Sequence, residues 1–125
     1  MKTPVASTYS PILVVDTTDR DQICLALIQA NKPTKKTKIA ERAQSLPEHL
    51  EKFLAQAEFP QAIALLRQPG SLTGVRVGMS AINTLAWLNN VLIIEIDQGD
   101  FETAISQIKK KPSQFKVVAQ TTPIS

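Results

Sequence analysis

The sequence predicts an α/β domain with a four-stranded, mainly parallel sheet, helices on its faces and an inserted pair of helices. Two short apolar runs, residues 12–15 and 91–97, are typical of strands that are buried on both faces of a sheet. Segments with helical spacing alternate with the strands, and this order favours right-handed crossovers between parallel strands. An α+β ferredoxin-like arrangement is the alternative, because the expected helix at residues 80–90 is short.

Length and composition indicate one globular unit. We expect residues 1–125 to form a single domain, since a chain of this length can bury one core of ordinary size. Hydrophobic residues make up 43% and charged residues 20% of the chain, which excludes a disordered protein. No stretch approaches the roughly 20 apolar residues of a membrane helix, so we expect no membrane contact and a cytoplasmic protein.

After the first strand, the sequence predicts a helix at residues 19–30. Thr18 and Asp21 have the spacing of a helix cap, and the apolar residues that follow, including Cys24, recur at helical intervals. The lysine-rich segment 32–38 is then predicted to be a mobile basic connector.

A helical insert is predicted at residues 45–68. Ser45 and Glu48 have the spacing of a capping box, and apolar residues repeat behind them with the period of a helix. Pro60 divides the segment, so we expect two helices that pack against each other.

The second half of the chain is predicted from alternating patterns. Val75, Val77 and Met79 alternate with polar or small residues, which favours a half-exposed strand, and Ser80 can cap the short helix after it. The predicted elements are, in order, a strand at 75–79, a helix at 80–90, a strand at 91–97, a helix at 101–111 and a strand at 115–120.

The sequence lacks the residues that most known types of catalytic site require. The chain has one histidine and one cysteine, which excludes a disulfide framework and a zinc site built on paired histidines or cysteines. We expect Cys24 to be a buried thiol and His49 to lie on the solvated face of a helix. No glycine-rich phosphate loop is present. The sequence therefore predicts no catalytic residue, no metal site and no cofactor.

A candidate ligand site is formed by polar residues that follow the predicted strands. If the strands are parallel, their carboxyl ends share one edge of the sheet, where ligands of open α/β sheets bind. The candidate residues are Asp16, Thr17, Thr18, Ser80 and Asp97. A divalent cation or a phosphate group would suit them, but Asp, Ser and Thr at such junctions also serve as caps. We accordingly expect Asp16 to stabilise the junction between the first strand and the following helix rather than to act in catalysis.

A candidate nucleic-acid site is formed by the predicted connector. The net charge of the chain is +3, and the segment 31–45 alone carries five basic residues against one acid. The candidate residues are Lys32, Lys35, Lys36 and Lys38. Lysines can neutralise phosphates, but no aromatic residues that could stack on bases accompany them.

From these observations we expect a non-enzymatic binding or regulatory module that acts through protein–protein interaction in a cytoplasmic assembly. The expected partner is another protein or a second copy of the chain, since symmetric dimers are the commonest oligomers. Two alternatives remain open. One is a nucleic-acid-binding protein that uses the 32–38 segment, and the other is a small-ligand or metal-dependent phosphate-handling site at the carboxyl ends of the strands.

Overall fold

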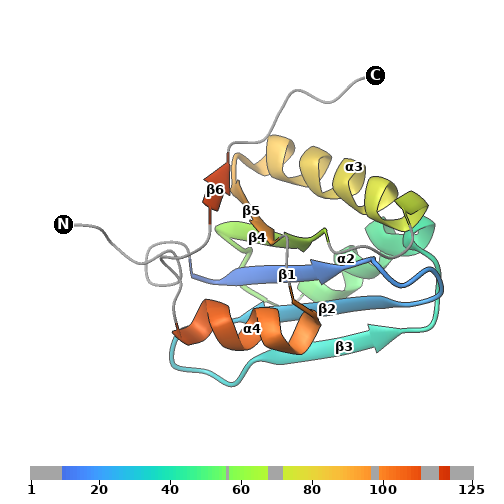
Figure 1. Ribbon diagram of the computed structural model, residues 1–125. Helices are drawn as coiled ribbons and strands as arrows, with labels where there is room; N and C mark the ends of the chain where they lie inside the picture. The colour runs from blue at the N-terminus through green and yellow to red at the C-terminus, as the bar shows by residue number, and fades with distance from the viewer. Residues whose placement is uncertain (1–9, 56, 68–71, 97–98, 111–115, 119–125) are drawn as a thin grey trace.

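The computed structural model describes residues 10–55, 57–67, 72–96, 99–110 and 116–118, and within them one mixed β-sheet has helices on both faces (Figure 1). The six strands of this described part are β1 (Ile12–Asp16), β2 (Ile23–Ile28), β3 (Lys35–Ile39), β4 (Ala62–Leu66), β5 (Leu92–Ile96) and β6 (Lys116–Val118). Their order across the sheet is β3-β2-β1-β4-β5-β6.

Strand direction divides the sheet into three parts. β1, β4 and β5 are parallel to one another, whereas β2 and β3 on one side and β6 on the other are antiparallel to their neighbours. The predicted α/β fold with a single sheet is therefore confirmed, but a four-stranded, mainly parallel sheet is wrong. The ferredoxin-like alternative is also wrong, because that arrangement covers only one face of its sheet with helices.

The predicted helix at residues 19–30 is strand β2. All six side chains of Ile23–Ile28 are buried, so the segment is apolar throughout and shows no alternation. When every residue of a segment is apolar, the positions three and four apart are apolar too, so the segment also fits the pattern of a helix. This explains the error. The residues expected to cap a helix form a turn instead, in which Asp21 N donates to Asp19 Oδ1 at 2.8 Å.

The predicted mobile connector at residues 32–38 contributes most of strand β3. Lys35–Ile39 pairs with β2 and lies at an edge of the sheet, where charged side chains point to water and discourage pairing with other chains. The lysines are compatible with a strand here because β3 pairs with β2 alone, so the lysine side chains of this edge strand can reach water.

The predicted helical insert at residues 45–68 is correct only in its first half. A 3-10 helix η1 (Ala43–Ser45) leads into α2 (Leu46–Leu54), with Pro47 in the first turn. The second half is β4, and all five of its side chains are buried because the strand is central in the sheet.

The predicted strand at residues 75–79 and the short helix after it belong to one helix, α3 (Leu72–Asn89). Val75, Ile82 and Ala86 are buried, and their spacing of seven and four residues places them on one side of this helix. The alternation of Val75, Val77 and Met79 is therefore incidental, and Ser80 lies in the helix interior rather than at its cap.

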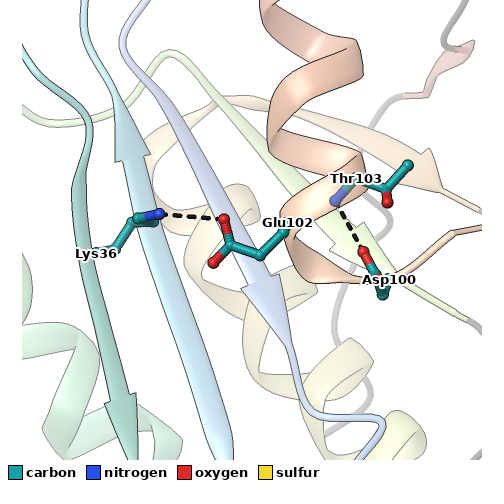
Figure 2. Close-up of polar contacts among 4 residues, drawn as sticks. All are labelled: Lys36, Asp100, Glu102 and Thr103. Carbon is teal, nitrogen blue, oxygen red and sulfur yellow. Dashed lines mark hydrogen bonds and ion pairs between the residues drawn. The ribbon is translucent and has the colours of Figure 1, made fainter.

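The helices form layers above and below the sheet. α4 (Phe101–Lys110) covers one face, and η1, α2 and α3 cover the other (Figure 1). Alternate residues of β1 and β2 belong to the two separate cores on the two faces. At the start of α4, Asp100 Oδ1 accepts a hydrogen bond of 2.8 Å from Thr103 N, which caps the helix and lowers the pKa of Asp100 (Figure 2).

Helix α3 passes very close to the turn between β1 and β2. Thr17 Oγ1 donates to Gly74 O at 2.9 Å, and Gly78 faces the same side chain. A Cβ on residue 78 would overlap Thr17 Oγ1 and lie 3.3 Å from Thr17 Cβ and Cγ2. Glycine is therefore required at position 78 for space rather than for backbone conformation.

We predict that Gly78→Ala lowers the free energy of unfolding by about 1–2 kcal/mol, because overlap with Thr17 outweighs the higher helix propensity of alanine. Thr17→Ala removes the overlapping atoms, so the double variant should lose at least about 0.5 kcal/mol less than the sum of the two single variants. Urea denaturation of the four proteins measures this coupling. Strictly additive losses would show that the two residues do not collide.

Candidate functional site

The turn that follows β1 is organised by Asp16. Its Oδ1 atom accepts hydrogen bonds from Thr18 N at 2.8 Å and from Thr18 Oγ1 at 2.6 Å. The next residue, Thr17, is only 1% exposed and holds the turn against α3 through Gly74. The turn is thus fixed both internally and to the helix behind it.

The carboxyl ends of the three parallel strands meet at the edge of the sheet beside this turn. Val15 of β1 is in register with Leu65 of β4, so Arg67 lies one residue past the end of β4 at the level of the turn. Arg67 N donates to Ile96 O at 2.9 Å, and Arg67 Nη1 donates to Glu95 Oε2 at 2.8 Å. Glu95 is in register with Leu65 of the core under α2 and α3, so the Arg67–Glu95 pair lies on that side of the sheet. Asp16 is in register with Cys24 of the core under α4, so its carboxylate lies on the other side. Asp97 lies outside the described residues.

Of the four predicted ligand-site residues that the structure describes, three come together. Asp16, Thr17 and Thr18 share the turn, whereas Ser80 is exposed on α3 and lines a groove against α2. Gly78 faces Thr17, and two further residues turn the helix by about 200°, which directs Ser80 away from the turn. Arg67 was not among the residues predicted from the sequence, although a basic residue directly after a buried apolar run was a usable signal.

The lysines of the predicted connector are divided between the two faces of β3. Lys36 forms an ion pair with Glu102 of α4 at 3.1 Å, as Figure 2 shows. On the other face, Lys35 Nζ donates to Phe53 O at 3.0 Å and lies 4.8 Å from the centre of the Phe53 ring. Lys32 and Lys38 are exposed. Lys38 shares the α4 side of the strand with Lys36, because both are in register with β2 residues of that core.

An apolar groove of about 770 Å³ lies between α2 and α3. Its walls include Leu50 and Leu54 from α2 and Leu85 and Leu88 from α3, and Leu88 is 74% exposed. The sequence indicated the apolar side of α2. The contribution of α3 to the groove could not be predicted, because α3 was predicted as a strand and a short helix.

The remaining candidate residue with reactive chemistry is Cys24. It is buried in β2, and burial, together with the nearby Asp16 carboxylate, raises the pKa of its thiol. A thiol of this kind stays protonated and is a poor nucleophile or metal ligand. Among the described helices, none has the length and apolar character needed to cross a bilayer.

Comparison with solved structures places this fold among known proteins. A structure of YeaZ from Pseudomonas aeruginosa superposes with a TM-score of 0.65 at 22% sequence identity, over 81% of this chain and 49% of YeaZ. A second structure, titled as an uncharacterized protein with similarity to peptidase YEAZ from Pseudomonas aeruginosa, gives the same values. The chain thus spans about half the length of these two proteins, and at this identity the likeness establishes the fold alone.

Comparison with sequences is more specific. No curated protein sequence matches the chain. Residues 29–119, which begin directly after β2 and run through β6, match the family described as TsaD: tRNA N6-adenosine threonylcarbamoyltransferase. Because this match covers well over half of the chain, the protein belongs to the TsaD family of tRNA N6-adenosine threonylcarbamoyltransferases.

Proposed function

We propose that this protein acts in the transfer of a threonylcarbamoyl group to N6 of adenosine in tRNA. The observation that carries the proposal is the family match over residues 29–119, and the fold shared with YeaZ supports it. The proposal retains a cytoplasmic location, as expected from the sequence.

This family membership corrects the function predicted from the sequence. A non-enzymatic regulatory or adaptor module defined by protein binding is wrong, because the matched family is named for a group transfer to tRNA. Neither alternative, the nucleic-acid-binding protein or the phosphate-handling site, named this reaction. The family match extends over 91 residues, whereas the predictions from the sequence were based on short motifs.

The edge of the sheet beside Asp16 is the site that we assign to a small ligand of the reaction. Its support is its position at the carboxyl ends of β1, β4 and β5, where open α/β sheets bind ligands. The Asp16 carboxylate supplies hydrogen-bond acceptors there, so it can orient a polar molecule that carries donors. The Thr17 contact with α3 keeps the edge rigid, which reduces the entropy lost on binding.

Contact with tRNA is assigned to lysines of and beside β3. Lys32, Lys36 and Lys38 are exposed, and the Lys36–Glu102 pair is open enough to water that a phosphate can replace the carboxylate. Lys35 is left out because its amine is held at the end of α2. A protein partner, also expected from the sequence, belongs to the same proposal, and the apolar groove between α2 and α3 is the surface that supports it.

We predict that cells lacking this protein lose N6-threonylcarbamoyladenosine from their tRNA. Mass spectrometry of digested tRNA measures the modified nucleoside against unmodified adenosine. Expression of the full chain should restore it, whereas a Leu13→Asp variant, which places a charge in the core, should not. Unchanged levels of the nucleoside in the deletion strain would refute the proposal.

We predict that Asp16→Asn lowers the rate of modification about tenfold or more, since a hydrogen bond to a charged group contributes roughly 1.5–3 kcal/mol. Asparagine keeps the Oδ1 acceptor used by Thr18, so the melting temperature should change little. Asp19→Asn is the matched control, because Asp19 forms a similar turn bond to Asp21 but is exposed. Equal rates for the two variants would remove Asp16 from the site.

We predict that replacing Lys32, Lys36 and Lys38 together by alanine weakens tRNA binding and reduces its salt dependence. Three lost phosphate contacts should reduce the slope of log affinity against log salt by roughly 2–3. Lys109→Ala with Lys110→Ala serves as the control, since these exposed lysines lie in the last turn of α4. An unchanged slope in the triple variant would exclude this surface as the tRNA contact.

A further inference from the structure

One cluster of metal-ligating side chains lies apart from the sites above. It consists of Glu41, which follows β3, and of Glu48 and His49 in the first half of α2. One potential ligand atom from each residue lies within 4.8 Å of the other two. Within this group, His49 Nε2 and Glu41 Oε1 are 3.0 Å apart. Two separate segments of the chain thus converge on one point.

The distance between His49 and Glu41 is close to that in a tetrahedral metal site. Zinc binds histidine nitrogen and carboxylate oxygen at about 2.0–2.2 Å, so two ligand atoms on one tetrahedral ion are about 3.3–3.5 Å apart. The His49–Glu41 distance of 3.0 Å needs only a small separation of the two atoms. Glu48 is exposed, and a change of its rotamer can bring its carboxylate to the same ion.

The cluster supplies more ligand atoms than its ion pair uses. The pair between His49 and Glu41 needs one carboxylate, and Glu48 adds a second one within 4.8 Å. The His49 side chain is only 16% exposed, so its ring is held in place, whereas the Glu41 side chain is 50% exposed and can adjust.

We propose that Glu41, Glu48 and His49 form a binding site for a divalent transition-metal ion of the zinc type. An imidazole with two carboxylates suits zinc better than magnesium or calcium, which prefer oxygen ligands alone. His49 binds through Nε2 and keeps its ring proton on Nδ1, and water completes the coordination. The ion joins the segment after β3 to α2 and so stabilises their relative position. This proposal is independent of the tRNA function.

The single histidine of the chain makes the test unambiguous. We predict that the untagged, full-length protein binds one equivalent of zinc by calorimetry, and that the same equivalent shifts the ring nitrogen resonances of His49 in NMR spectra. Glu41→Gln and Glu48→Gln should each weaken binding by about tenfold or more, since even the loss of an outer-sphere contact costs 10- to 100-fold. Both residues are exposed, so these variants should remain folded.

Glu51→Gln is the matched control, because Glu51 is an exposed glutamate of α2 that lines the apolar groove and not the cluster. It should bind zinc as tightly as the unchanged protein. The proposal is overturned if His49 resonances stay unshifted when zinc is added to the folded protein. It is equally overturned if the glutamate variants of the cluster bind as tightly as Glu51→Gln does.

Discussion

Burial of the central strands on both faces is the constraint on which the rest of the structure depends. No side chain of β2 or β4 is exposed, and in β1 only Asp16 escapes full burial. Each large apolar side chain taken from water contributes about 1.5–3 kcal/mol, so these strands carry much of the stability of the fold. Polar chemistry is thereby confined to strand ends, edge strands and helix surfaces, which is where the candidate sites lie.

The same constraint explains which elements the sequence could reveal. Helices α2 and α4 each have one face in water, so their apolar residues recur at helical spacing and were predicted near their true positions. Strands β1 and β5 were also found, because short β-branched runs with polar exits are distinctive. β2 and β4 were missed because both are buried on all sides. Such a segment has no polar face, so its sequence shows neither the two-residue period of a strand nor the 3.6-residue period of a helix.

Helix α3 shows a different reason for failure. Its residues 75–79 alternate by chance, and the glycine at position 78 suggests a strand or turn in the sequence alone. Only the approach of the β1–β2 turn, where Thr17 fills the space of a Cβ, explains why a helix carries glycine there. Because α3 was not recognised, Ser80 was assigned to the strand ends and the groove against α2 could not be foreseen. Arg67 was missed for a related reason, since its place at the same edge of the sheet as Asp16 depends on the parallel pairing of β1 with β4.

The polar contacts between layers position the sites more than they stabilise the fold. The Lys36–Glu102 and Arg67–Glu95 pairs are partly or largely exposed, and such pairs contribute about 0–1 kcal/mol. By contrast, the Thr17–Gly74 bond is buried, and its loss would deprive the buried Thr17 hydroxyl of the acceptor that it uses there. The turn that contains Asp16 is fixed in place, since it continues a buried strand and is tied to a helix. An edge lysine can exchange its partner for a phosphate at little cost, whereas the turn can hold a small ligand in one orientation. The two kinds of contact thus suit the two tasks in the function that we propose, which are loose binding of a large polyanion and precise binding of a small reactant.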